Sequence, residues 1–560
     1  MVRKVFQLFN KEVRGLHEAA YLLAIFAFLS QILGLVRDRI LASQFGAGEL
    51  LDVYYAAFRI PDLLYVVIST LVSVSVLVPF LVRKIDQSKK ELRHFVDNVF
   101  STLIIISLGL LIVAFFLTKP LLHYIVPELL DGKYGGQLVL MTQILLLQPL
   151  LLALSSLFSS VIQAYKKFFV YALSPILYNL GIIIGIVFFY PYFGTIGLVF
   201  GVILGALLHL LIQIPVSVNQ GIVPRFTFKI DWKTVKEVLL LSVPRTFALT
   251  SVQLILIFLV GIAGGMIAGS ISVFTFSYNL QSVPMSIIGV SYSLAAFPTL
   301  SRLFARGEIK TFLQHIVKAA QHIIFWSLPV MVMFIVLRAQ IVRTILGSGE
   351  FDWNDTRLTA AALAIFAVSV LAQNLSLLLV RGYYSVGDTK RPIIVMIISA
   401  IITIVSSFLL VSAFKEIEFF RDFIEVLMRV EGLPGTIILM LPLAFSIGQI
   451  INTVTLWILF DLQYKCFTRS IGQTFIHSLG ASLIMGYVAF VFLNIFDSVF
   501  DLNTLGGVFL QGFLSGIIGI IAGVVVLVLL NNRELSIVWK TLHKKIWKTK
   551  LVAAEPEDVS

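Results

Sequence analysis

The chain has 560 residues, of which 59% are hydrophobic and only 13% charged, and its mean hydropathy is +0.98. Soluble globular chains carry about 25% charged residues, so this composition excludes a soluble protein and predicts one membrane domain. The net charge of +12 does not indicate nucleic-acid binding, because the basic residues lie in short loops between apolar runs. The single cysteine, Cys466, excludes an internal disulfide and a site with several thiolate ligands to a metal.

Fourteen apolar runs are long enough to cross a bilayer as a helix, which takes roughly 20 residues. Their centres lie near residues 30, 67, 106, 150, 180, 206, 250, 283, 328, 370, 403, 448, 485 and 518. We therefore predict an all-α polytopic membrane protein with 14 transmembrane helices. The expected parts are an N-terminal segment (1–18), helices 1–6 (19–222), helices 7–11 (223–414), an outer amphipathic helix (415–435), helix 12 (436–466), helices 13 and 14 (467–532) and a C-terminal tail (533–560).

Lysine and arginine accumulate in alternate loops, and cytoplasmic loops are the ones enriched in these residues. The alternation predicts that both termini are cytoplasmic. The basic segments are the N-terminus, the second, fourth, sixth, eighth, tenth and twelfth loops, and the tail, with Arg83, Lys89, Lys166, Arg225, Lys310, Lys390, Lys465 and Arg533 among their residues.

One loop on the predicted outer side, residues 415–431, has apolar residues near helical spacing with charges between them. This pattern predicts an amphipathic helix that lies along the membrane interface. A helix that binds a soluble partner is the alternative.

The chain contains a weak internal repeat. At an offset of 219 residues Pro79 aligns with Pro298 and Arg83 with Arg302, and at an offset of 218 Gln163-Ala164-Tyr165 aligns with Arg381-Gly382-Tyr383. An offset of six helices preserves direction across the membrane, so the halves are expected to be parallel repeats. We predict two six-helix lobes, helices 1–6 and 7–12, with helices 13 and 14 added, and a transport mechanism of alternating access.

Arginines inside apolar segments are candidates for ligand binding, because a charge at the centre of a transmembrane helix costs about 3 kcal/mol or more. Arg37, Arg59 and Arg245 are expected to line a cavity and to bind phosphate or carboxylate oxygens bidentately. The alternative is structural pairing, Arg37 with Asp52 and Arg59 with Asp62. For two further arginines, snorkelling towards the interface is the simpler interpretation: Arg39 and Arg381.

No catalytic motif is present in the sequence, so we predict a transporter and neither an enzyme nor a metal protein. No nucleotide-binding loop is present either. We expect no cofactor, and transport is expected to use an ion gradient, the membrane potential or the substrate gradient. Histidines in helices, such as His209, are expected to be hydrogen-bonded core residues.

Three stretches resemble the MurJ/MviN lipid II flippases, and the resemblance spans the chain. The first runs from Ser30-Gln31-Ile32-Leu33-Gly34-Leu35-Val36-Arg37-Asp38 through Phe45-Gly46-Ala47-Gly48 and Asp52 to Phe58-Arg59-Ile60-Pro61-Asp62. The others are Pro284, Gly289 and Phe297-Pro298-Thr299-Leu300-Ser301, and Tyr383-Tyr384-Ser385-Val386-Gly387-Asp388-Thr389-Lys390-Arg391-Pro392.

The resemblance implies the fold of the multidrug/oligosaccharidyl-lipid/polysaccharide exporter superfamily in the bacterial inner membrane. It implies a flippase that moves lipid II, the undecaprenyl-diphosphate-linked peptidoglycan precursor, from the inner to the outer leaflet. The implied partners are that precursor, membrane lipids and the cell-wall synthesis machinery. The substrate-binding residues expected on this basis are Arg37, Asp38, Asp52, Arg59, Arg245 and Asn279.

The sequence departs from the family pattern at several positions. Gln31 and Asn279 stand where the family usually has arginine, the neighbourhood of Tyr65 lacks another arginine, and Thr70 takes the place of a glutamate. Two alternative functions therefore stay open. One is export of another polyprenyl-diphosphate-linked oligosaccharide, of the O-antigen or teichoic-acid type, and the other is a non-transporting membrane scaffold.

Helices 13 and 14 are implied by the resemblance to form a groove for the polyprenyl tail. Gly506 to Leu530 contains no charge. Glycines at three- to four-residue spacing allow a shallow groove or close helix packing, and packing is the alternative. The candidate groove residues are Gly512, Gly516, Gly519 and Gly523.

Overall fold

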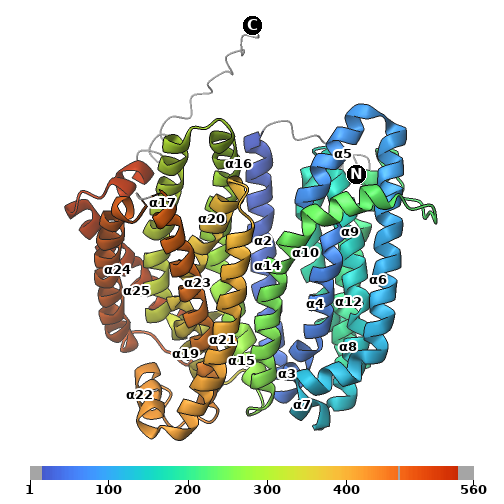
Figure 1. The fold of residues 1–560 in the computed structure, drawn as a ribbon. Helices are drawn as coiled ribbons and strands as arrows, with labels where there is room; N and C mark the ends of the chain where they lie inside the picture. Colours follow the sequence, from blue (N-terminus) through green and yellow to red (C-terminus); the bar gives the residue numbers. More distant parts are fainter. Residues whose placement is uncertain (1–15, 73, 465–466, 540–560) are drawn as a thin grey trace, which may run out of the picture. The chain divides into compact units, whose positions relative to one another are not determined.

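The computed structural model describes residues 16–72, 74–464 and 467–539, and within these ranges the chain is helical and contains no strand (Figure 1). The α-helices are α2 (Leu16–Phe45), α3 (Glu49–Ala57), α4 (Arg59–Ser69), α5 (Val74–Gln87), α6 (Lys89–Ile125), α7 (Pro127–Asp131), α8 (Gly135–Leu145), α9 (Leu147–Ala164), α10 (Phe168–Ile184), α11 (Tyr190–Phe193), α12 (Thr195–Leu211), α13 (Ile214–Asn219), α14 (Trp232–Gly264), α15 (Ser270–Pro284), α16 (Ser291–Ala305), α17 (Ile309–Val336), α18 (Arg338–Leu346), α19 (Trp353–Val368), α20 (Val370–Ser385), α21 (Lys390–Glu416), α22 (Glu418–Met428), α23 (Met440–Tyr464), α24 (Phe467–Asp497) and α25 (Leu505–Leu529). Short 3₁₀ turns are η1 (Thr70–Val72) and η4 (Thr436–Leu439), and π-helical segments are η2 (Gly185–Phe189) and η3 (Met285–Val290).

Many of these helices are long and apolar enough to cross a membrane. Ten segments of the described chain meet this condition, and the number is 11 if α19 and α20, which are bent by 41° at Ser369, count as one span. A helix satisfies its own backbone hydrogen bonds, as the hydrocarbon layer requires. The chain is therefore a multi-pass, all-α membrane protein.

Helix ends follow local sequence signals. Ser88 caps α6 by accepting a hydrogen bond from the Glu91 N–H, and Thr504 caps α25 by accepting one from the Gly507 N–H. The predicted outer amphipathic segment contains α22, which exposes Phe419, Phe423 and Val426 and buries Ile424.

The chain divides into two compact units. The first consists of Met1–Val283, Ile341–Phe366 and Asp388–Asn452. In it, α2 packs against α10, α10 against α12, and α14 against α4, α6 and α21. This unit contains all six of the predicted substrate-binding residues.

The second unit consists of Pro284–Gln340, Ala367–Gly387 and Thr453–Ser560. Its centre is α17, which packs against α20 and α24, and α24 in turn packs along α25 (Figure 1). This division differs from the predicted lobes of helices 1–6 and 7–12, so the two-lobe arrangement stays a prediction.

Glycines bring α10 and α12 close together. A Cβ atom on Gly205 would lie 2.4 Å from the Tyr178 carbonyl oxygen, and one on Gly185 would lie 2.4 Å from Gly201 Cα, so neither position has room for a side chain. Small residues at the spacing of one helical turn let transmembrane helices approach at backbone distance. The contact fixes α10, which carries a residue of the site described next.

Candidate functional site

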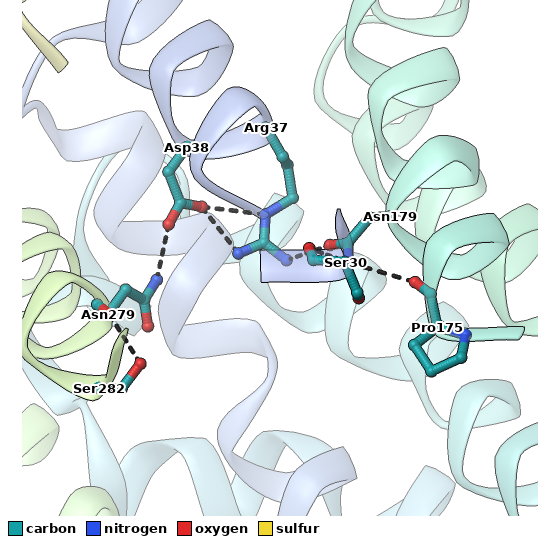
Figure 2. A network of polar contacts seen from close by, with 7 residues as sticks. All are labelled: Ser30, Arg37, Asp38, Pro175, Asn179, Asn279 and Ser282. Carbon is teal, nitrogen blue, oxygen red and sulfur yellow. Dashed lines mark hydrogen bonds and ion pairs between the residues drawn. The ribbon is translucent and has the colours of Figure 1, made fainter. Parts of the chain in front are cut away.

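A polar network in the first unit joins α2, α10 and α15. Arg37 donates from Nε and Nη2 to Asp38 Oδ1, at 2.9 and 2.8 Å. The other carboxylate oxygen, Oδ2, accepts a hydrogen bond from Asn279 Nδ2 at 3.1 Å. Figure 2 shows Arg37 and Asp38 on neighbouring positions of one helix, with Asn279 reaching the carboxylate from another. The structure thus brings together three of the six predicted substrate-binding residues.

Asn179 of α10 holds the other side of the Arg37 guanidinium. Its Oδ1 accepts a hydrogen bond from Arg37 Nη1 at 3.2 Å, and its Nδ2 lies 3.3 Å from Ser30 Oγ and 3.2 Å from the Pro175 carbonyl oxygen. The amide is therefore fixed by its own helix and by α2 (Figure 2). A buried amide with partners on both ends orients the guanidinium that it contacts.

Burial differs within the network. Asp38 is almost fully buried, at 3% exposure, whereas the side chain of Arg37 is 22% exposed. Three of the five N–H groups of Arg37 are used by Asp38 and Asn179. The remaining two have no partner among the described residues, so Arg37 retains donors for oxygen atoms of a ligand.

Arg59 begins α4, and its Nε donates to the Tyr55 carbonyl oxygen at 3.2 Å. Within the described residues no ion pair joins Arg59 to Asp62, although Asp62 follows one turn later. The alternative in which Asp62 neutralises Arg59 by direct contact is therefore wrong for this structure.

Asp52 lies on α3 and belongs to a different contact. Its carboxylate accepts hydrogen bonds from the Gly269 N–H at 2.7 Å and from the N–H and hydroxyl of Ser272 at 2.7 and 2.6 Å. The alternative that paired Arg37 with Asp52 is wrong, because each has other partners. Asp52 joins α3 to the start of α15.

The other arginines differ in their surroundings. Arg245 lies on α14, but its side chain is outside the described residues. Arg39 donates from Nη1 to the carbonyl oxygens of Thr344 and Ile345, at 2.7 and 3.2 Å, and so binds the negative end of α18. The Arg39 guanidinium is therefore bound within the protein, and the snorkelling interpretation is wrong for this residue. In the second unit, Arg381 Nη1 is buried without a hydrogen-bond partner in the described part of the chain.

Ser30 and Asn179 are not among the site residues predicted from the sequence. The one sequence feature that could have indicated Asn179 is its side-chain amide inside an apolar span, because an amide is costly to bury there without hydrogen-bond partners. Gln148 gives the same weak signal, and its Nε2 donates to the Tyr178 hydroxyl at 3.1 Å. His209 is hydrogen-bonded to Ser155 at 2.7 Å, as a histidine of the core should be.

The four glycines predicted to form a lipid groove are buried in the second unit. A Cβ atom on Gly516 would lie 3.3 Å from Leu337 Cδ1, and one on Gly519 would lie 2.8 Å from the Met485 carbonyl oxygen. Likewise Gly512 faces Gln340 and Gly523 faces Met485. This glycine face therefore packs against α17, α18 and α24, which is the packing alternative.

The network offers groups that can bind an anion. It offers guanidinium and amide donors beside a carboxylate that already accepts three hydrogen bonds. Among the described residues no group of three or more histidine, cysteine, aspartate or glutamate side chains is arranged to hold a metal ion. Guanidinium N–H groups in a site of limited water access bind phosphate oxygens.

A family model described as "Lipid II flippase MurJ" matches residues 41–420, which is more than half of the chain. The chain belongs to the lipid II flippase MurJ family. The lipid II flippase MurJ of Burkholderia cenocepacia is 27% identical over 394 residues, covering 69% of this chain and 76% of that protein. The probable lipid II flippase MurJ of Rickettsia prowazekii is 29% identical over 406 residues, covering 72% and 80%. These relatives are named as flippases, which are transporters.

Solved structures show the same fold. One described as lipid II flippase MurJ in an inward closed conformation has a TM-score of 0.72 at 24% identity, covering 93% of this chain and 99% of that chain. An inward-facing multidrug resistance MATE family transporter of the MOP superfamily has a TM-score of 0.62 at 14% identity, covering 78% and 96%. The fold of this MurJ family member is therefore shared with transporters of the MOP superfamily.

Proposed function

We propose that this chain moves lipid II from the inner to the outer leaflet of the bacterial cytoplasmic membrane. The observation that carries the proposal is Arg37, a partly exposed arginine within a transmembrane helix of a MurJ family member. Two of its N–H groups have no partner in the part of the chain that the structure describes, and they suit the diphosphate of a polyprenyl-linked precursor. We take the headgroup to bind beside Arg37 and Asn279.

Fourteen spans are part of the proposal. In the described part of the chain ten spans meet the length and hydropathy condition, and together with the bent pair α19 and α20 they account for 11 of the 14 predicted segments. The other three predicted segments are also helices in the structure: one is α2, one is α4 followed by α5, and one is α14. These three carry Arg37, Arg59 and Arg245. With 14 spans and the observed alternation of basic loops, both termini lie in the cytoplasm.

Alternating access between two six-helix lobes is the mechanism that we infer. The internal repeat supports it, because Pro79 of α5 and Pro298 of α16 both lie inside helices at the aligned positions. The energy source that we propose is an ion gradient, the membrane potential or the substrate gradient, without a bound cofactor. The cell-wall synthesis machinery is the proposed cellular partner.

The polyprenyl tail is proposed to lie on the side of α25 away from its glycines. Ile520, Ile521 and Val525 of this helix are at least half exposed. At its end, α25 contributes Val524, Leu527 and Val528 to an open pocket of about 650 Å³. An apolar face and an open pocket on the same helix suit a long hydrocarbon chain.

The direct test has two parts. The gene should restore growth of a bacterium depleted of its own lipid II flippase, and the purified protein should move fluorescent lipid II across vesicle bilayers. Transport of an O-antigen-type undecaprenyl-diphosphate oligosaccharide without transport of lipid II would instead establish the alternative exporter. Failure to move either lipid would leave a non-transporting scaffold.

A further inference from the structure

Residues 220–231, which we call the linker, connect α13 to α14 and are hydrogen-bonded along the side of α6. At one end, Arg93 donates from Nε and Nη2 to the Gly221 carbonyl oxygen, at 3.0 and 2.7 Å. Gly221 has a φ of 72°, which lies in the left-handed region that favours glycine. The linker thus begins at a fixed point on α6.

Further along, side chains of α6 accept hydrogen bonds from the linker backbone. Asp97 Oδ1 binds the Arg225 N–H at 2.7 Å, Ser101 Oγ binds the Thr227 N–H at 2.8 Å, and Asn98 Oδ1 binds the Asp231 N–H at 3.0 Å. Because the acceptors lie on successive turns of one helix, the linker is held along α6 at several points. Figure 1 draws this green segment crossing α6 near the beginning of that helix.

The side chains of the linker remain exposed while its backbone is held. Phe226 is 44% exposed and Phe228 88% exposed, and their rings meet edge to face at a centroid distance of 4.9 Å. Trp232, at the first position of α14, is 62% exposed. Three aromatic residues are therefore presented outward by a segment with little freedom to bury them.

Basic residues surround these aromatic residues. Between residues 223 and 236 there are four basic side chains and one acidic side chain, which gives a net charge of +3; the basic ones are Arg225, Lys229, Lys233 and Lys236. The acidic one, Asp231, caps α14 by accepting hydrogen bonds from the Lys233 N–H and the Thr234 hydroxyl. The Thr234 hydrogen bond lowers the pKa of Asp231, and this carboxylate is engaged with the end of α14.

The position along α6 identifies the partner. The charged end of this helix is Lys89–Asp97, and its apolar stretch follows from Val99. If α6 spans the membrane, this change in polarity places residues 93–101 at the boundary between water and hydrocarbon, and the linker lies beside them. Aromatic residues favour this boundary, and lysine and arginine beside it attract anionic headgroups.

We propose that residues 223–236 form a docking surface for anionic phospholipid headgroups. In the orientation proposed above, the leaflet is the inner one, but the docking itself does not depend on that orientation. Phe226, Phe228 and Trp232 enter the headgroup layer, and Arg225, Lys229 and Lys233 bind its phosphates. These contacts hold the segment between α13 and α14 at a fixed depth in the headgroup layer. The strength of its binding to the membrane therefore depends on the content of anionic lipid.

Local lipid enrichment tests the proposal. Val223 is 52% exposed and precedes the aromatic residues. We would label Val223→Cys with a fluorophore in a Cys466→Ser background and place the full-length protein in nanodiscs. The nanodiscs contain a trace of spin-labelled phosphatidylglycerol or spin-labelled phosphatidylcholine as quencher. We expect phosphatidylglycerol to quench several times more strongly, because each basic residue enriches an anionic lipid about fivefold.

Two variants and one control position separate the contributions. The triple variant Arg225→Gln, Lys229→Gln, Lys233→Gln should remove the preference while leaving the backbone hydrogen bonds in place. Phe226→Ser with Phe228→Ser should weaken quenching by both lipids and keep their ratio. A label at Tyr192→Cys, on an 84% exposed residue in an uncharged stretch, should show no preference.

The contrary results are equally clear. Equal quenching by the two lipids at Val223→Cys, or an undiminished preference in the triple variant, overturns the proposal. Protection of the label from both lipids and from aqueous iodide also overturns it, because another protein surface would then cover the segment. Loss of lipid II transport in the same preparations has no influence on these outcomes, so the two proposals fail separately.

Discussion

Arg37 and Asp38 carry opposite charges, and the third member of their cluster, Asn279, is neutral. The cluster therefore has no net charge when both ionisable groups are charged. The diphosphate binding that we propose would therefore depend on directed N–H groups more than on a general positive potential. Asn179 matters for this reason, since it fixes the plane of the Arg37 guanidinium.

The first prediction separates the ligand-binding role of Arg37 from its structural role. Arg37→Ala should abolish lipid II transport and also lower the stability by about 3–5 kcal/mol, because Asp38 is left buried without its partner. The paired change Arg37→Gln, Asp38→Asn leaves no unpaired charge. We expect it to restore the unfolding temperature in detergent but not transport in vesicles.

Arg37→Lys is the conservative control. It should recover part of the transport, because an ammonium group keeps the charge but lacks the planar fork. Full transport by the paired variant would show that Arg37 and Asp38 have a structural role only.

At this scale the sequence predicted residue types better than contacts. Arg37 was identified as a charge inside an apolar segment, Asp38 and Asn279 through the family resemblance, and the structure joins the three. Asn179 was not identified, because it lies 142 residues from Arg37 in the sequence and a single amide forms no motif with its neighbours. The alternative Arg37–Asp52 pair failed for a related reason, since the Asp52 carboxylate is satisfied by backbone N–H groups of residues 269 and 272, which no charge pattern reveals.

Helices were predictable as elements, because apolar runs of the right length must be helical in a bilayer. Their interruptions were not. The bend at Ser369, the 3₁₀ turn after α4 and the π-helical segment before α16 occur inside runs whose hydropathy is continuous. The glycines of α25 show the same limit, because their spacing suits a groove and a packing face equally and only the neighbours of each Cβ position distinguish the two.

The second prediction compares the two faces of α25. Gly516→Trp inserts a ring against Met333 of α17 and against Leu337, the residue that follows α17. This overpacking should lower the unfolding temperature and impair export of long- and short-chain substrates alike. Ile521→Trp changes a residue that is 57% exposed on the open face. It should leave stability nearly unchanged and reduce export of the long-chain lipid more than that of a short-chain analogue.

The comparison is made with purified protein in vesicles, using lipid II analogues that differ only in prenyl length. Equal effects of Ile521→Trp on both analogues would remove the open face of α25 as the tail site. A selective effect of Gly516→Trp on the long chain would contradict the packing role of the glycine face.

For the molecule as a whole, hydropathy and the loop charges determine different properties. The apolar runs fix how much of the chain lies in the membrane, whereas the alternation of lysine and arginine fixes the direction of each helix. The two compact units each contain both kinds of loop. The orientation can therefore be tested separately in each unit, and an error in the helix count between them would appear as a disagreement.

The last prediction uses two exposed positions in each unit, all in a Cys466→Ser background. In the first unit these are Lys89, at the start of α6, and Asp131, at the end of α7. In the second they are Lys310, near the start of α17, and Asp497, at the end of α24. Single cysteines at Asp131 and Asp497 should react with a membrane-impermeant thiol reagent in intact cells. Cysteines at Lys89 and Lys310 should react only after the membrane is opened, because positively charged loops stay in the cytoplasm. Reaction of all four cysteines in opened cells controls for accessibility.

If the cysteines at Lys89 and Asp131 behave as expected, but the one at Lys310 reacts in intact cells and the one at Asp497 does not, the second unit is inverted relative to the charge rule. The number of spans between α7 and α17 would then differ by one from the proposed count, and the parallel repeat would have to be abandoned.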